Sequence, residues 1–317
     1  MANFTNLSGI TYCGKEGNEI FSKSLYTIDL ATYGITYMPN VKGKQKLYSG
    51  EIGDAWQQYT CDFTPQGLAS LSEAYIEPVA IKVNMENCFD QYWPTYLVEQ
   101  TQINLHGGIP QTFAEWFFAK LVEKMKREYQ EIFWQGDTSY SGATKVYKKV
   151  TDGIEKKLES ASGSSAANKI SGSAFTVANI VEQVESVITS GMSVAANGEI
   201  DTDGWKVFMN YADVDVLKMA LGKSCCPNNQ SIFSNYANVN GRVYIFGVEV
   251  VPTMQSRNTI IYGPARNLVL GFDTESAETE YEIINMRQTT GDNKFRVIAI
   301  TNIAVGIVAP ELFTYLR

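Results

Sequence analysis

The stretch that most restricts the fold of this chain lies at residues 294–310. Its sequence is KFRVIAITNIAVGIVAP, in which apolar side chains recur at every second position. This period of two is typical of a β-strand, and the strand it predicts is unusually long. The intervening positions are largely apolar too, so we expect both faces to be covered and the strand to lie between two layers. The apolar positions of one parity are Phe295, Val297, Ala299, Ile303, Val305 and Ile307.

A second strong pattern predicts a long helix at about residues 111–134. Pro110 precedes the pattern and Gly136 follows it, as is usual at the start and the end of a helix. A helix of about 23 residues is roughly 35 Å long, which makes it the longest regular element that we expect. Its apolar face consists of Phe118, Val122, Met125, Tyr129 and Ile132, at spacings of four, three, four and three.

The first part of the chain predicts extended structure. Residues 1–35 contain scattered glycines and no sustained period, which indicates an arm that needs a partner surface. From residue 35 to about 61, lysines and glycines interrupt a strand-like pattern, and we expect a long, polar hairpin that faces solvent and cannot bury itself. Residues 79–86 alternate apolar and polar side chains and predict a half-buried strand.

The second half alternates between helix and strand signals. Residues 137–174 are rich in Gly, Ser and Ala and predict a flexible loop or a boundary between lobes. We then expect a helix capped by Thr176 that ends near Gly191, a strand at 205–210, a short helix at 214–221, a turn at Asn240-Gly241 and strand structure in RVYIFGVEVVP. A strand at 281–287 and a turn at Gly291-Asp292 lead into the long terminal strand. The predicted fold class is α+β.

Composition excludes several classes of protein. The chain of 317 residues has 26 Lys+Arg against 34 Asp+Glu, a formal net charge of -8. A protein that grips nucleic acid by neutralising phosphates needs clustered cations, so this charge argues against such binding, although it permits a protein that encloses nucleic acid. The 18 Tyr, 15 Phe and 5 Trp exclude intrinsic disorder for most of the chain, because they supply a large buriable surface.

The cysteines and the apolar stretches indicate the cellular compartment in which the protein is made. Five cysteines are an odd number at no metal-like spacing, and we interpret them as reduced thiols of a protein made in a cytosol. The N-terminal residues MANFTNLSGI have neither a basic nor an apolar region, so we expect no signal peptide. The longest apolar stretch is well short of the ~20 residues that a membrane helix needs, so we expect no membrane association.

The residues that could carry chemistry do not form a recognisable site. His106, the single histidine, lies in NLHGGIP, but no G-x-S-x-G accompanies it, and we interpret it as a turn residue. Asp201 and Asp203 lack the remaining ligands of a calcium loop and predict a surface turn. Phosphate-binding, dinucleotide-binding and zinc motifs are absent from the sequence. We therefore expect no catalytic residues, no metal site, no cofactor and no enzymatic activity.

Two groups of cations have alternative interpretations. Lys124, Lys126 and Arg127 alternate with glutamates at helical spacing, which favours a salt-bridged surface over a nucleic-acid patch. The lysines of the predicted hairpin form the second group. They either protect a strand edge from unwanted pairing or meet acidic residues of a neighbouring chain. The length expected for the hairpin favours the neighbouring chain. These hairpin cations are Lys42, Lys44 and Lys46.

The order of the expected elements resembles a known family. An arm, a long hairpin, a long helix, an α/β insertion and a long terminal hairpin occur in the major capsid protein of tailed bacteriophages with the Hong Kong 97 phage fold. The phrases NLVLGFDTESAETEYEIINM and TGDNKFRVIAITNIAVGIVAP resemble the ending of these capsid proteins. The segment CDFTPQGLASLSEAYIEPVAIKVNMENC, with Cys61 and Cys88 at its ends, is similar to the E-loop exit of capsid proteins from phages of Bacteroidetes and crAss-like lineages.

The resemblance implies a division of the chain into the parts of that fold. Residues 1–35 would form the N-terminal arm, 36–90 the E-loop hairpin and its exit strand, and 91–150 the P-domain with its spine helix. Residues 151–270 would form an α/β A-domain, and 271–317 the terminal β-hairpin of the P-domain. The candidates for contacts between subunits are then Lys42, Lys44, Lys46, Tyr48 and Trp56.

The resemblance also implies a structural function. Copies of the chain would assemble, in the cytoplasm of a host bacterium, into hexamers and pentamers of an icosahedral phage head in the virion, and this head would enclose double-stranded DNA without sequence-specific binding. Portal, scaffold and decoration proteins would be further partners. An encapsulin-type compartment that encloses cargo enzymes is the alternative within this fold. A soluble enzyme or a binding protein is a remote alternative, which only the abundant Tyr, Trp and Asn suggest.

Overall fold

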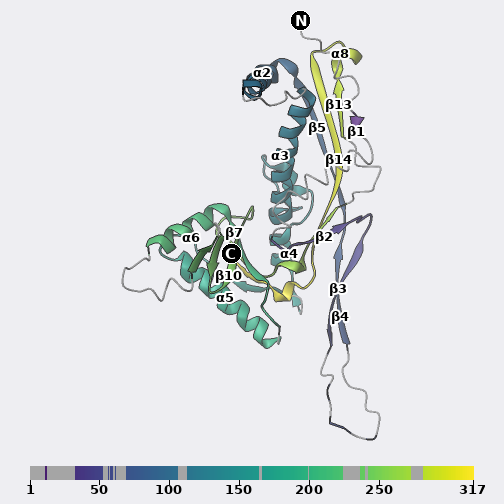
Figure 1. Ribbon diagram of the computed structural model, residues 1–317. Coiled ribbons are helices and arrows are strands. Elements are labelled where there is room, and N and C mark those ends of the chain that lie inside the picture. The colour runs from purple at the N-terminus through teal and green to yellow at the C-terminus, as the bar shows by residue number, and fades with distance from the viewer. Residues whose placement is uncertain are drawn as a thin grey trace.

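The computed structural model describes residues 11–12, 33–52, 56, 58–59, 61, 69–105, 113–163, 166–198, 200–223, 236–239, 242–272 and 281–317. Figure 1 shows an elongated body made of helix α3 (Phe113–Gln135) and long strands, a lobe of mixed helices and strands at its side, and a hairpin that leads away from the body. Most of the predicted N-terminal arm lies outside the described residues. Its described part includes β1 (Thr11–Tyr12), which pairs antiparallel with β13 (Tyr281–Asn285).

The body is built on one sheet, called here the long sheet, with β14 (Lys294–Ile307) in its middle. β14 pairs antiparallel with β5 (Val79–Cys88), with β13 (Tyr281–Asn285) and with β12 (Leu268–Phe272). β12 in turn pairs in parallel with β2 (Thr36–Pro39). The strand predicted at 79–86 is thereby confirmed, and the strand predicted at 294–310 is confirmed as far as Ile307. All six apolar residues of one parity in β14 are buried, as the alternation predicts.

Two helices cover the upper part of the long sheet. They are α2 (Phe89–Leu105) and α3 (Phe113–Gln135), and α3 confirms the long helix predicted at about 111–134. The rings of Phe89, Phe113 and Phe117 all lie within 6 Å of Phe295 on β14. We did not predict α2, because its apolar residues do not follow a helical period and Pro94 stands inside it.

The lobe contains a seven-stranded sheet, called here the lobe sheet, of strand order β6-β15-β11-β7-β10-β9-β8. Its side chains alternate between two cores, as the period of a strand requires. Val207 and Met209 face α5 (Ile180–Asn197) and α6 (Tyr211–Lys223), while Phe208 faces Phe133 and Trp134 at the end of α3. The strands are β6 (Asn168–Ile170), β7 (Trp205–Asn210), β8 (Tyr236–Val239), β9 (Arg242–Ile245), β10 (Val248–Thr253), β11 (Ile260–Pro264) and β15 (Thr314–Leu316).

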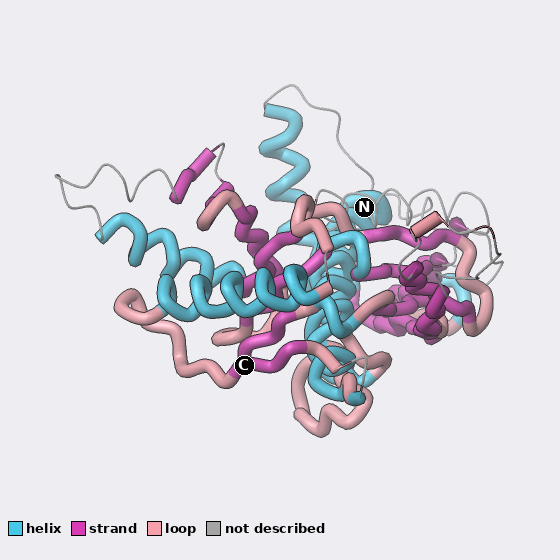
Figure 2. Tube along the Cα trace, turned by 90° about the horizontal axis from the view of Figure 1, so that it is seen from below, coloured by secondary structure: helices cyan, strands magenta, loops and turns pink. Residues whose placement is uncertain are grey.

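The core that contains Phe208, Phe133 and Trp134 joins the lobe to the body. Trp134 and Phe133 are fully buried, and the ring centroids of Trp134 and Phe208 are 5.2 Å apart. In the view from below, Figure 2 shows two groups of strands, one seen nearly end on and the other accompanied by helices. The C-terminal end of the long helix thus belongs to the core between them. Strand β7 and helix α6 confirm the elements predicted at 205–210 and 214–221, and α6 is longer than predicted.

The hairpin consists of β3 (Gln45–Ile52) and β4 (Ala69–Ile76), which pair antiparallel from Gln45 opposite Ile76 to Ile52 opposite Ala69. The prediction that the hairpin closes by about residue 61 was wrong. Its second strand, ASLSEAYI, is rich in Ala and Ser, which have a weak preference for strands, so the pairing partner is what makes it a strand.

The region 137–174, predicted as a flexible loop or a boundary between lobes, contains three short elements. They are the 3-10 helix η2 (Val146–Lys149), helix α4 (Ile154–Ser160) and strand β6. Ile154 and Leu158 on α4 are fully buried against the core at the end of α3. The loop prediction was therefore wrong at these residues, because tertiary burial stabilises a helix that is too short to form alone.

The helix predicted from Thr176 to Gly191 differs at both ends. It is α5, which begins at Ile180 and continues to Asn197. The predicted cap is wrong, because the Thr176 hydroxyl and backbone amide both donate to Oδ1 of Asn179, at 3.0 and 2.8 Å. Gly191 does not end the helix: a Cβ there would lie 2.3 Å from the ring of Tyr262, so the glycine allows the helix to approach β11 closely.

Two strand predictions also change. RVYIFGVEVVP forms β9 and β10, because Phe246 and Gly247 have φ values of 51° and 79° and make a two-residue turn between the strands. The strand predicted at 281–287 ends at Asn285, whose side chain accepts a hydrogen bond from the Arg287 amide and caps the short helix α8 (Met286–Thr289). The predicted turn at Asn240-Gly241 lies outside the described residues. The remaining short elements are η4 (Ala265–Asn267) and η5 (Pro310–Leu312).

Candidate interaction surfaces

The base of the hairpin is anchored in the long sheet. Val41, Leu47 and Ile76 are buried against Val269 on β12 and Ala304 on β14. Two glycines of the long sheet leave the room for this contact: a Cβ at position 271 would lie 3.0 Å from Val41, and one at 306 would lie 3.1 Å from Leu47. The direction of the hairpin is therefore set by packing at its base.

Charged and aromatic side chains occupy the exposed face of the hairpin. Lys46 on β3 forms an ion pair of 2.8 Å with Glu73 on β4, and the Tyr75 hydroxyl donates to Glu73 at 3.0 Å. The hydrogen bond to Glu73 raises the pKa of Lys46 above its ordinary value, and the same bond, with that from Tyr75, lowers the pKa of Glu73. The Lys44 ammonium lies 4.5 Å from the centre of the Tyr75 ring.

The structure places the five residues that the sequence suggests for contacts between subunits along this hairpin. Lys42 and Lys44 precede β3, Lys46 and Tyr48 lie in β3, and Trp56 follows it. All five are exposed, Tyr48 to 57% and Trp56 to 96%. Lys46 has an acidic partner within its own chain, which neither interpretation of the hairpin lysines anticipated. Their role in contacts between subunits stays a prediction.

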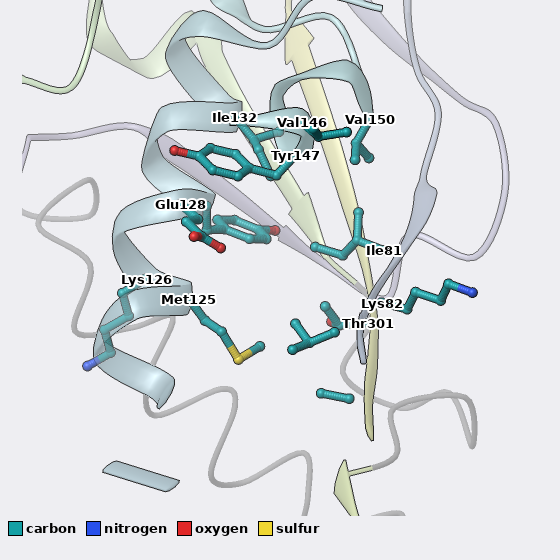
Figure 3. A pocket seen from close by; sticks show the side chains of 13 residues that line it. Ile81, Lys82, Met125, Lys126, Glu128, Ile132, Val146, Tyr147, Val150 and Thr301 are labelled. Carbon is teal, nitrogen blue, oxygen red and sulfur yellow. The ribbon is translucent and has the colours of Figure 1, made fainter. Parts of the chain in front are cut away.

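A cavity of about 320 Å³ lies between α3 and the long sheet. Figure 3 shows Met125 and Ile132 of α3 on one side, Ile81 of β5 on the other, and Val146 of η2 at one end. Its lining is mainly apolar, and no motif in the sequence indicates it, because the side chains come from four separate elements. Thr301 of β14 also lines it; this residue is 3% exposed, and its hydroxyl has no hydrogen-bond partner among the described residues.

Ionisable side chains gather beside this cavity, where α3 meets η2. The Glu131 carboxylate accepts hydrogen bonds from Tyr147, at 2.7 Å, and from Lys145, at 2.9 Å. Burial alone would raise the pKa of Glu131, but these hydrogen bonds outweigh it and lower the pKa. Lys148 donates to Gln135 at 2.5 Å, and its own burial lowers its pKa. The group fixes η2 on the helix, and no motif in the sequence indicates it.

The charged face of α3 agrees with the interpretation made from the sequence. Lys124 pairs with Glu128 one turn later at 3.7 Å, and Lys120 pairs with Glu99 of α2 at 3.4 Å. Cations that have carboxylate partners at this spacing are typical of a solvated surface. The predicted salt bridge is therefore present at Lys124, and for Lys126 and Arg127 the interpretation stays a prediction.

The residues considered for chemistry do not converge. His106 lies outside the described residues. The Asp203 amide donates to the Asp201 carboxylate at 3.0 Å, which confirms the predicted surface turn. Within the described ranges, no three His, Cys, Asp or Glu side chains are grouped so that they could hold a metal ion. None of the helices in these ranges is long and apolar enough to cross a membrane.

The sequence of this chain matches no known family profile and no curated protein. Its structure, by contrast, is similar to solved phage assemblies over nearly the whole chain. A chain of the satellite phage P4 procapsid, which includes the size determination protein, aligns with a TM-score of 0.59 at 12% identity and covers 94% of this chain and 89% of its own.

Two other solved assemblies give the same result. A chain of the native GTA particle capsid aligns with a TM-score of 0.56 at 11% identity, over 92% of this chain and 90% of its own. A chain of the capsid of Myoviridae phage XM1 has a TM-score of 0.52 at 13% identity, with 91% of each chain covered. The chain therefore has the α+β fold of phage capsid proteins, the Hong Kong 97 phage fold that the sequence led us to expect.

Proposed function

We propose that this chain is the major capsid protein of a phage, a structural subunit that assembles into hexamers and pentamers of an icosahedral shell. The observation that carries the proposal is the shared fold, which extends over about nine-tenths of this chain and of chains from three capsid or procapsid structures. Because the fold alone does not determine function, the exposed hairpin supplies an independent argument.

The shape of the molecule supports assembly. The two strands of the hairpin leave the body at its base and lead away from it (Figure 1), so their outer face lacks a covering layer among the described residues. Contacts that join different patches of identical subunits head to tail close into rings. A permanent interface of this kind usually buries more than about 2,000 Å², and an extended hairpin adds such area without a large flat patch.

The charge of the chain supports a shell that encloses double-stranded DNA without binding a particular sequence. A net charge of -8 keeps the protein from gripping phosphates, so a packaged strand can move against the wall. We place the assembled chain in the virion and its assembly in the cytoplasm of the host bacterium. Portal, scaffold and decoration proteins are the further partners that such a shell would have.

Electron microscopy with size-exclusion chromatography tests the proposal on the full chain expressed alone and with any scaffold encoded beside it. Closed shells or capsomer rings are the expected result, and native particles should contain double-stranded DNA. Particles that hold enzymes in place of DNA would indicate an encapsulin-type compartment. A monomer under both conditions would contradict assembly altogether.

A further inference from the structure

We infer that the cavity between α3 and the long sheet receives the side chain of Trp56 from a second copy of this chain. This inference rests on the proposed function and adds to it a defined contact between subunits. Trp56 is 96% exposed, and the nearby Tyr59 is 88% exposed. Buried tryptophans that fill pockets are the residues that most often dominate the binding energy of an interface.

The cavity suits a single large side chain. Its volume of about 320 Å³ is at the lower end of the roughly 300–1,000 Å³ usual for pockets that hold small molecules. Ile81, Val83, Met125, Val146 and Ala299 provide apolar contacts for an aromatic ring. Val146 is 62% exposed, so the cavity is accessible at the η2 side without any rearrangement of the chain.

The cavity also offers a partner for the indole nitrogen. An indole N–H can only donate a hydrogen bond, and it usually finds an acceptor when it is buried. The buried Thr301 hydroxyl, which has no partner among the described residues, can accept one. The Glu128 side chain lies beside the same space in Figure 3 and provides a second acceptor.

A second copy is needed because the hairpin points away from its own cavity. Leu47 and Ile76 hold the base of the hairpin on the long sheet. From there β3 and β4 lead away from α3 (Figure 1), whose C-terminal half lines the cavity. Trp56 follows the far end of β3 in the sequence, so the chain cannot bring it back to α3 while the base stays packed.

The charges around the two surfaces are complementary. Lys42, Lys44 and Lys46 lie at or before the start of the hairpin, and Lys46 is paired with Glu73. Residues 47–72, which contain Trp56, include three acidic side chains and no lysine or arginine. Lys82 and Lys126 flank the cavity and extend outward on its two sides in Figure 3. Such complementarity guides the approach of two surfaces and disfavours wrong partners. It therefore favours the acidic part of the hairpin around Trp56 as the occupant of this cavity.

Fluorescence of assembled particles provides the first test. The signal of Trp56 is the difference between the wild-type chain and a Trp56→Phe variant, both as the full chain. Upon assembly this difference spectrum should shift to shorter wavelength and lose most of its quenching by acrylamide. Particles in which acrylamide quenches Trp56 as strongly as in the unassembled chain would overturn the inference and leave the proposed function intact.

A pair of matched variants tests the cavity itself. Val146→Glu places a charge at the mouth of the cavity at a 62% exposed position, and Met219→Glu places one on α6 at a 60% exposed position. Val146→Glu and Trp56→Ala should each raise the concentration needed for assembly about ten-fold or more, the loss typical of an interface hot spot. Met219→Glu should leave this concentration within about two-fold of wild type, since distant surface changes cost little.

The combined variant distinguishes this contact from others. If Trp56 enters the cavity, both changes remove the same contact. The double variant Trp56→Ala with Val146→Glu should then need no higher concentration for assembly than the single variant that assembles less well. Additive losses, or a Val146→Glu variant that assembles normally while Trp56 is protected, would place Trp56 elsewhere and overturn the inference. A wild-type chain that never assembles would overturn the proposed function and this inference together.

Discussion

Glu155 of α4 accepts a hydrogen bond of 2.5 Å from the backbone amide of Ser256, which follows β10 of the lobe sheet. The contact joins two segments that are 101 residues apart. Gln135, at the end of α3, donates to the Met254 carbonyl in the same loop. Together these bonds tie the lower end of the long helix and α4 to the lobe, so the junction between body and lobe depends on polar contacts as well as on the core around Trp134.

The first prediction concerns the pH dependence of this junction. Burial raises the pKa of Glu155 above its ordinary value of 4.5, and the Ser256 hydrogen bond opposes that change only in part. A carboxyl whose pKa is raised in the folded state contributes stability that is fully present below the unfolded pKa and is lost as pH rises through the folded pKa. Relative to Glu155→Gln, the wild-type chain should therefore lose stability as pH rises above about 4.5.

Urea unfolding of both chains between pH 4.5 and pH 8 measures this difference. Glu182→Gln, which removes an exposed carboxyl from α5, is the matched control. If the difference in the free energy of unfolding between wild type and Glu155→Gln stays constant over this pH range, the Glu155 carboxyl does not titrate at a raised pKa.

The second prediction concerns the close approach of two backbones after α3. A Cβ on Gly136 would lie 2.2 Å from the Thr151 carbonyl oxygen, and Gly153 donates to the Gly136 carbonyl at 2.9 Å. Gly136→Ala should thus lower the free energy of unfolding by about 1–3 kcal/mol, the usual cost of overpacking. Gly222→Ala in α6 has open space around it and should gain up to about 1 kcal/mol. Denaturant titration checks both, and equal stabilities would contradict the steric argument.

The third prediction concerns the ion pair across the hairpin. Lys46→Glu places two carboxylates at diagonal positions on the same face of the hairpin, so the amides of β3 should exchange with deuterated solvent faster than in the wild type. The swapped double variant, Lys46→Glu with Glu73→Lys, should restore slow exchange. Because both side chains are exposed, the differences should shrink at high salt. A double variant that exchanges as fast as Lys46→Glu would mean that the pair does not hold the strands together.

The fourth prediction concerns the turn between β9 and β10. Phe246 has a φ of 51°, a backbone conformation that costs an ordinary residue roughly 1–2 kcal/mol. Asn adopts it readily and is favoured, before a glycine, in such two-residue turns. Phe246→Asn should therefore raise the thermal midpoint of unfolding, while the β-branched Phe246→Val should lower it. A decrease with Asn would indicate that contacts of the Phe246 ring outweigh the backbone strain.

Residues that belong to long, regular patterns were predictable. The alternation in β14 placed Phe295 and Val305 in the core, and the helical spacing in α3 placed Tyr129 and Ile132 there. Such patterns suffice because one covered face of a strand or helix must consist of apolar side chains at a set period. The exposed position of the hairpin lysines followed from their charge in the same way.

Elements that depend on distant partners were not predictable. α4 forms because Ile154 and Leu158 are buried against residues remote in the sequence, and β4 is a strand because β3 pairs with it. The candidate contact site has the same origin: Trp56 could be named from the sequence, whereas the cavity proposed to receive it exists only where α3, β5, β14 and η2 meet. The sequence by itself thus determined the long strand, the long helix and the fold class, since these depend on local period. Tertiary structure decided the short elements, the junction and the cavity, because their stability comes from contacts between segments that no local pattern connects.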